Sequence, residues 1–397
     1  MSAHAEVHAP VGGKLMTRPF MILLAVAAVG ALVALYRFVN GIGSVSNLSN
    51  GYPWGIWIAI DVVVGTAIGC GGYAVGLLVY ILNKGQYHPL VRAAVLTSLL
   101  GYGLAVIAVM IDLGRYWALW KVPIFVWRWS HSPQLEVALC VAAYTLVLMI
   151  ELSPALFEKW RDGASSGARR FATGGLKFVE KNFVWLLALG LLLPTMHQSS
   201  LGTMMLLPGP RMNPLWFTPW LPLLFLVNAI IMGFAVVVLE ATFSSVAFGR
   251  KRETAMLASL SYVAAWVALG WAVFRVGEVA IAGKLHYLAS GAGIAFLFEV
   301  GLLVLGAGIL LTARRNQASW QVRGAIILFL GTAFHRVNTY LIAFNPGANY
   351  SYFPALPELL ITLGIIAAEV AIYIAVVKTF PILAGAPSAS ASVRRAS

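Results

Sequence analysis

Ten apolar runs, each long enough to cross a lipid bilayer, constrain this chain more than any other feature. A helix that spans the hydrocarbon layer needs about 20 mostly apolar residues. Runs of this kind cover residues 19–39, 55–82, 92–117, 134–157, 181–201, 220–248, 256–281, 286–312, 321–344 and 357–380. Only 10% of the 397 residues are charged, against about a quarter in soluble domains. The sequence therefore predicts an all-α integral membrane protein with about ten transmembrane helices.

These runs divide the chain into three parts. Residues 1–18 are expected to form a cytoplasmic N-terminal tail and residues 19–380 the ten-helix transmembrane domain. Residues 381–397, rich in Ala and Ser, are expected to form a disordered cytoplasmic tail. The first run follows Lys14 and Arg18, as in a signal peptide, but it continues too far for a cleaved segment and is expected to remain as a helix.

The basic residues predict the orientation. The chain has 27 Lys and Arg against 14 acids, a formal charge of +13. Of these bases, 19 fall on the side that holds both termini and 8 on the other side. Because short cytoplasmic loops are enriched in Lys and Arg, both termini are expected in the cytoplasm of a bacterium, with the chain in its inner membrane. This distribution is typical of membrane topology and does not indicate a nucleic-acid partner.

The loops on the opposite side are poor in charge and rich in aromatic residues. Tyr52, Pro53 and Trp54 precede the second run, and Trp127 and Trp129 lie in the loop before the fourth. Aromatic residues of this kind suit either the interfacial belt of a membrane protein or a surface on which a partner protein docks.

Ionisable residues within the bilayer are costly, so each is a candidate for function. One group is expected at a single depth near the periplasmic face, from four consecutive segments: Asp61, Asp112, Arg115, His131 and Glu136. These side chains can form a polar pocket. Alternatively, they form a structural network in which Arg115 pairs with Asp112 or Asp61.

Further ionisable residues lie in later helices and at other depths. Arg275 and Glu278 are three residues apart and can pair on one helix face, which alone would explain their presence. The full set of candidates for a proton path is Glu151, His197, Glu240, Arg275, Glu278, Glu299, His335, Arg336 and Glu369. The carboxyl groups can equally be protonated and hold helices together by hydrogen bonds.

The two cysteines, Cys70 and Cys140, lie inside apolar runs. Two thiolates cannot hold an iron–sulfur cluster that needs four, so no cluster is expected in this chain. No metal site is expected either, and both cysteines are expected to be buried.

Several short segments resemble a known family when they are taken in order. They are NGYPWGIW (50–57), NKGQYHPLVR (83–92), IDLGRYW (111–117), LPTMHQSS (193–200), FRVGE (274–278), AFNPG (343–347) and YFP (352–354). Together they resemble the NrfD-like superfamily, the membrane subunits of polysulfide-reductase-type complexes. The resemblance covers residues 10–380 and is greatest to the membrane subunits of periplasm-facing nickel–iron hydrogenases of the hydrogenase-2 type.

The resemblance implies two four-helix bundles with flanking helices and a quinone, menaquinone or ubiquinone, bound near the periplasmic face of the first bundle. Electrons would come from a periplasmic ferredoxin-like iron–sulfur subunit, itself fed by the large and small subunits of a [NiFe]-hydrogenase. This chain would then be a subunit of a hydrogen:quinone oxidoreductase without its catalytic centre, and it can also translocate protons. No haem is expected, because the superfamily generally lacks one.

The residues themselves favour the same chemistry, because quinone reduction needs two electrons and two protons. Candidates for proton transfer are Asp61, Asp112 and Glu136. The quinone-binding candidates are Trp54, Asp61, Asp112, Arg115 and His131.

Two other functions remain open at the level of sequence. A haem b subunit needs two histidines at one depth on facing helices, and His197 with His335 meets the requirement of depth. A secondary transporter would also have ten spans and buried acids, but it would place its site at the midplane between interrupted helices.

Overall fold

The expected ten transmembrane helices are confirmed. The structure, a computed structural model, describes residues 8–163 and 165–385. Within these residues the spans are Arg18–Asn40, Trp57–Ile81, Gly85–Asp112, Pro133–Arg161, Phe183–Met204, Leu221–Ala247, Thr254–Ile281, Gly291–Leu311, Ala318–Ile342 and Leu356–Thr379. The chain is thus an all-α integral membrane protein.

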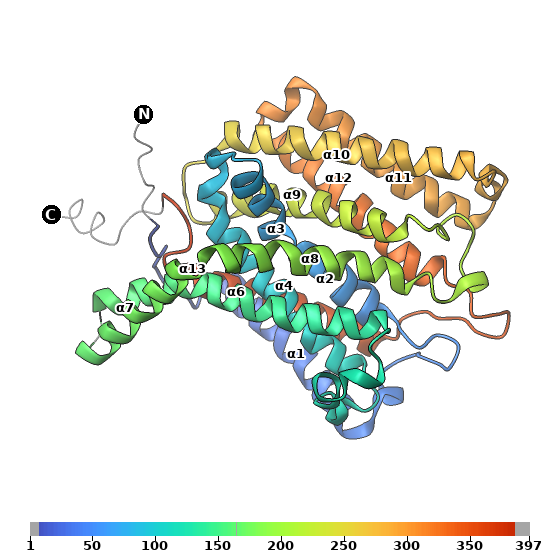
Figure 1. Cartoon of the computed structure of the whole chain (residues 1–397), viewed down its shortest axis with the longest axis horizontal. Helices are drawn as coiled ribbons and strands as arrows, with labels where there is room; N and C mark the ends of the chain where they lie inside the picture. Colours follow the sequence, from blue (N-terminus) through green and yellow to red (C-terminus); the bar gives the residue numbers. More distant parts are fainter. Residues whose placement is uncertain (1–7, 164, 386–397) are drawn as a thin grey trace.

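Eight of the spans form two four-helix groups (Figure 1). The first group consists of the second span, α4 (Val91–Asp112), α6 (Pro133–Gly163) and α8 (Phe183–Met204). The second consists of α9 (Leu221–Ala247), α10 (Thr254–Ile281), α11 (Gly291–Leu311) and α12 (Ala318–Val337). The groups meet where α9 packs against α8 and the second span.

Helices α1 (Arg18–Asn40) and α13 (Leu356–Thr379) pack together beside the first group. They approach closely because Gly30 faces Gly364, and a Cβ atom on either glycine would lie 2.7 Å from the Cα of the other. Small residues at such contacts are typical of helix packing in membranes. α13 also contacts α4 and the start of the second span, so it brings the end of the chain against its beginning.

The bundle has two distinct ends. We call the end with residues 8–17, 82–90, 248–253 and 312–317 the basic end; it also holds α7 (Ser166–Lys181), which projects beyond the bundle in Figure 1. We call the opposite end, with residues 41–56, 113–132, 205–220 and 343–355, the aromatic end. At the aromatic end Trp117, Trp120, Trp127 and Trp129 are all exposed.

The second span is irregular. It begins as a π-helix, η2 (Trp57–Val62), continues as α2 (Val63–Ile68) and α3 (Gly71–Gly76), and ends as a second π-helix, η3 (Leu77–Ile81). Single turns of π-helix often occur at functional positions because they redirect side chains. Here η2 carries Asp61.

Three boundaries differ from expectation. α4 ends at Asp112, so Arg115 lies on a loop and not in the last turns of that helix. The basic segment after α6, expected as a loop, contains the helix α7. Residues 381–385 do not belong to a disordered tail, since Ile382, Leu383 and Ala384 are buried and Ala384 forms an isolated β-bridge with His8. The rest of the expected tail, from residue 386, and residues 1–7 lie outside the described residues.

Candidate functional site

One face of α13 carries a column of polar side chains through the membrane. Glu358, Thr362, Glu369 and Tyr373 lie 4, 11 and 15 residues apart from the first. At about 100° per residue they fall within about 60° of the helix circumference and extend over about 22 Å of its length. Since the hydrocarbon layer is about 30 Å thick, the column covers most of it.

At the aromatic end, the Glu358 carboxyl group links α13 by hydrogen bonds to the loops at residues 41–56 and 343–355. Its Oε1 accepts hydrogen bonds from the backbone nitrogens of Asn47 (2.9 Å) and Ala355 (3.0 Å), and its Oε2 accepts one from the Tyr352 hydroxyl (2.5 Å). Burial and the bond to Glu358 raise the pKa of Tyr352, so this hydroxyl stays protonated as a donor. Trp57, which is wholly buried, donates from Nε1 to the backbone oxygen of Glu358 (3.3 Å).

Arg37 and Asp112 lie near each other beside Glu358. Arg37, on α1, is only 1% exposed, and its guanidinium interacts electrostatically with Asp112 at the end of α4. Asp112 also interacts with Glu358. The guanidinium donates to the backbone oxygen of Leu113, but its Nε and the Oδ1 of Asp112 are buried without a hydrogen-bond partner. Such atoms are costly in lipid and are suited to hydrogen-bond a ligand or a water molecule.

Asp61 continues the column toward the middle of the membrane. It is 6% exposed, and its Oδ2 accepts a hydrogen bond from Thr362 of α13 (2.8 Å). Asp61 also interacts electrostatically with Glu369, about two turns beyond Thr362. The π-helix η2 and α13 therefore bring two carboxyl groups from distant parts of the chain close together.

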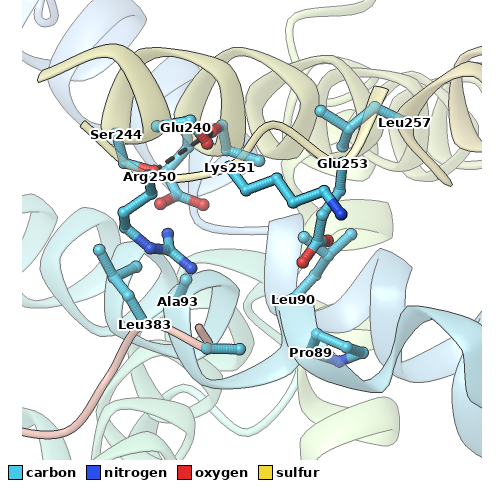
Figure 2. A pocket seen from close by; sticks show the side chains of 13 residues that line it. Pro89, Leu90, Ala93, Glu240, Ser244, Arg250, Lys251, Glu253, Leu257 and Leu383 are labelled. Atoms are coloured by element: carbon cyan, nitrogen blue, oxygen red, sulfur yellow. Dashed lines mark hydrogen bonds between the residues drawn. The ribbon is translucent and has the colours of Figure 1, made fainter. Parts of the chain in front are cut away.

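The column reaches the basic end through Glu240 of α9. Glu240 accepts a hydrogen bond from Tyr373, and with Glu369 it lines a groove of about 400 Å³ between α4, α9 and α13. Glu240 also lines a small cavity of about 30 Å³, shown in Figure 2, together with Arg250, Lys251 and Glu253 of the loop at the basic end. This volume can hold a water molecule.

Not all candidates from the sequence join this column. Arg115, His131 and Glu136 are exposed at the aromatic end, so the structure does not place them in a buried pocket with Asp61 and Asp112. The reason is that α4 ends before Arg115 and α6 begins at Pro133, which leaves Glu136 in its first turn. Trp54 donates from Nε1 to the backbone oxygen of Tyr340 (3.1 Å) and so binds the second helix group.

A second polar cluster lies in the second helix group. Glu299, wholly buried, accepts hydrogen bonds from Trp216 (3.2 Å) and Asn338 (2.8 Å) and contacts His335 Nδ1 at 3.0 Å. Arg275 pairs with Glu278 at 2.7 Å, as the three-residue spacing predicted. Among the described residues, no hydrogen bond or ion pair joins this cluster to Asp61 or Asp112, so it is separate from the column.

The remaining residues considered in the sequence analysis lie outside both the polar column and the Glu299 cluster. Arg336 is wholly buried and donates to Asn228 (2.7 Å), the Val63 oxygen (2.9 Å) and the Phe225 oxygen (2.8 Å), which is a structural link between α12, α9 and α2. Glu151 lines a different cavity, of about 240 Å³, between α6 and α8 with His88 and Arg92. Both cysteines are buried, as expected.

Four residues at or beside the column were not predicted from the sequence: Arg37, Glu358, Thr362 and Tyr373. The spacing of 4, 11 and 15 residues on one helix face would have shown that Glu358, Thr362 and Tyr373 accompany Glu369. For Arg37 there was a signal too, since it is the single charged residue between Arg18 and Asp61. Its packing against Asp112 depends on the contact of α1 with α13 and could not be deduced from spacing.

Comparisons with known proteins identify the family of this chain. The family model described as "Polysulphide reductase, NrfD" matches residues 44–345. The "Probable Ni/Fe-hydrogenase 2 b-type cytochrome subunit" of Escherichia coli (strain K12) is 38% identical over 94% of this chain and 94% of its own length. The "Menaquinone reductase, integral membrane subunit" of Nitratidesulfovibrio vulgaris (strain Hildenborough) is 30% identical over 55% of this chain and 52% of its own length.

The expectation that this chain carries no haem is contradicted by these comparisons, because the Escherichia coli relative is named a b-type cytochrome subunit. The histidine pair considered above does not fit a haem held between two axial ligands. His197 lies in the first helix group, with Tyr102 at 5.3 Å between ring centroids, whereas His335 lies in the second, with Trp271 at 4.8 Å. Neither histidine lines any of the three cavities described above.

The family match, the near-complete coverage of the Escherichia coli relative and the ten spans agree with one another. The chain belongs to the NrfD polysulphide reductase family and is a membrane electron-transfer subunit of an oxidoreductase.

Proposed function

We propose that the chain is the quinone-reactive membrane subunit of a respiratory [NiFe]-hydrogenase complex in a bacterial inner membrane. The names of two relatives, one a hydrogenase subunit and one a menaquinone reductase subunit, support this assignment. The basic end would face the cytoplasm, with both termini, because Lys and Arg concentrate on that side. The aromatic end would then face the periplasm.

The observation that carries the proposal is the pair of unpartnered buried atoms at the aromatic end, Arg37 Nε and Asp112 Oδ1. A quinone, menaquinone or ubiquinone, has carbonyl oxygens that accept hydrogen bonds. Arg37 would donate to one carbonyl oxygen and orient the ring. Asp112 would supply a proton to that oxygen as electrons arrive, in the manner of a general acid.

Electrons would enter from a partner docked on the aromatic end. Large aromatic side chains such as Trp117 (63% exposed) and Trp127 (65% exposed) are enriched in protein–protein interfaces, and the loops that carry them have few charges. The partner would be a periplasmic ferredoxin-like iron–sulfur subunit that takes electrons from the hydrogenase large and small subunits.

Protons would reach the quinone along the polar column of α13. Each quinone takes up two electrons and two protons to become the quinol. Glu240 contacts the cavity at the basic end, Glu369 shares a groove with Glu240, and Asp61 interacts with Glu369. Proton uptake from the basic end with oxidation of hydrogen on the opposite side would make the reaction contribute to a membrane potential.

The test compares Arg37→Met with Arg115→Met in the intact complex. Arg37 is buried beside Asp112, whereas Arg115 is an exposed arginine at the same end and serves as the matched control. We expect Arg37→Met to raise the KM for a water-soluble quinone analogue at least ten-fold, while hydrogen oxidation with an artificial dye stays unchanged. Equal KM values for the two variants would refute the proposed site.

A further inference from the structure

Helix α7 at the basic end is amphipathic. At about 100° per residue, Lys177, Arg170 and Lys181 fall within about 40° of its circumference, and all three are exposed. The opposite side holds small and apolar residues and packs against α6; Ala172 is wholly buried there. A helix with this division of residues lies in the interface plane of a membrane.

Between the two sides, α7 exposes an apolar edge. Phe171 and Phe178, seven residues apart, are 65% and 57% exposed. In water this exposure would be unfavourable, whereas at the boundary between headgroups and acyl chains the same rings are solvated by lipid.

A groove of about 490 Å³ runs between α6 and α7 beside this edge. Gly174 and Gly175 form part of its wall, and a Cβ atom on Gly175 would lie 2.4 Å from the Phe157 ring. The full lining is Met149, Ile150, Ser153, Phe157, Phe171, Gly174, Gly175, Phe178 and Val179. Since Ser153 is the single polar side chain in this lining, the groove suits a hydrocarbon chain.

The position of the groove along α6 matches the transition from hydrocarbon to headgroups. α6 has 31 residues, which corresponds to a length of about 46 Å. Its lining residues from Met149 to Phe157 lie about 24–36 Å from its beginning, and a bilayer has a hydrocarbon core of about 30 Å within a total of about 40–45 Å. The groove therefore opens at the depth where a phospholipid chain meets its phosphate.

We propose that this groove binds an anionic phospholipid from the leaflet at the basic end. An acyl chain would occupy the groove, and the phosphate-bearing headgroup would lie against Arg170, Lys177 and Lys181. These bases border the groove on the helix surface, because Gly174, a lining residue, is only about 20° from Lys181. The complementary charge selects an anionic headgroup over a zwitterionic one.

The first experiment titrates the purified full chain with phosphatidylglycerol and phosphatidylcholine of the same acyl chains and counts bound lipids by native mass spectrometry. We expect phosphatidylglycerol to bind at least ten-fold more tightly. The variant Arg170→Gln/Lys177→Gln/Lys181→Gln should lose this preference, at about five-fold per charge. The control Lys84→Gln/Arg252→Gln/Arg323→Gln removes three exposed bases elsewhere at the same end and should keep it.

The second experiment fills the groove. Gly174→Leu adds a side chain where a Cβ atom meets nothing within 4 Å, and Gly167→Leu does so on the same helix away from the groove. Gly174→Leu should weaken binding of both lipids at least ten-fold, while Gly167→Leu leaves both unchanged.

Three results would overturn the proposal. Equal affinity of the unmodified chain for the two lipids would remove the role of charge. Equal losses in the two glycine variants would place the bound lipid elsewhere. A dimer of the chain that disappears in Gly174→Leu would assign the groove to a contact between two copies.

Discussion

Replacing Asp112 with Asn tests the proposed proton donor with a nearly isosteric change. Asn keeps the shape of the side chain at the end of α4 but cannot release a proton to a quinone oxygen. A positioned general acid contributes about 10²–10⁴-fold to a rate. We therefore expect kcat for hydrogen-dependent quinone reduction to fall at least 100-fold, while dye reduction by the same complex is unchanged.

The same substitution leaves the buried Arg37 without its opposite charge. Removal of one partner from a buried ion pair costs about 3–5 kcal/mol. Because the two side chains interact electrostatically and do not form a direct hydrogen bond, we expect a loss of at most about 3 kcal/mol, the lower limit of that range. A double variant, Arg37→Met/Asp112→Asn, should recover the lost thermal stability and remain inactive toward quinone.

Glu136→Gln is the matched control, because Glu136 is an exposed carboxyl at the same end. Its quinone activity should equal that of the unmodified complex. The reasoning fails if Glu136→Gln loses as much activity as Asp112→Asn, or if the double variant recovers quinone reduction along with stability.

Three further predictions concern other parts of the structure. Glu369→Gln should slow quinone reduction at least ten-fold and increase its solvent deuterium isotope effect. Glu299→Gln, outside the column, should leave the isotope effect unchanged. The reverse pattern would contradict the proton path. Arg336→Met removes three hydrogen bonds made by a wholly buried guanidinium, and each bond to a charged group contributes about 1.5 kcal/mol or more. The variant should therefore have a lower melting temperature in detergent; an unchanged melting temperature would show that these bonds are dispensable. Burial, with a smaller contribution from Arg92, lowers the pKa of His8 to about 4, so the packing of His8 against Ala384 should weaken as pH falls from about 6.5, the pKa of free His, toward 4. Amide protection factors at residues 9–12, which correct for the intrinsic exchange rate at each pH, should be smaller at pH 5 than at pH 7 and should not change with pH in His8→Gln; equal protection factors at the two pH values would contradict this.

The fold could be predicted from the sequence because lipid restricts the alternatives. Each of the ten apolar runs corresponds to one transmembrane helix, and most predicted helix ends lie within a few residues of the observed ends. α7 escaped prediction because its sequence, with two adjacent glycines and four bases, has no apolar run. Its helical form becomes apparent only from the alternation of basic and apolar residues around the helix.

The candidate site could be predicted only in part. Asp61 is buried and so is the Oδ1 atom of Asp112, as expected for acids within apolar runs; their part in quinone binding stays a prediction. Glu136 and Arg115 were placed at the same depth by counting residues, but depth along a helix does not specify which way a side chain points or where the helix ends. Arg37 and Glu358 became part of the site through the packing of α1 and α13, segments about 300 residues apart in the chain.

A map of the complex with a bound quinone analogue would test the central claim most directly. The account predicts density for the analogue at the aromatic end of the first helix group, with a carbonyl oxygen within hydrogen-bond distance of Arg37 and the Asp112 carboxyl beside it. Density for the analogue in another place, with Arg37 and Asp112 bonded only to protein, would contradict it.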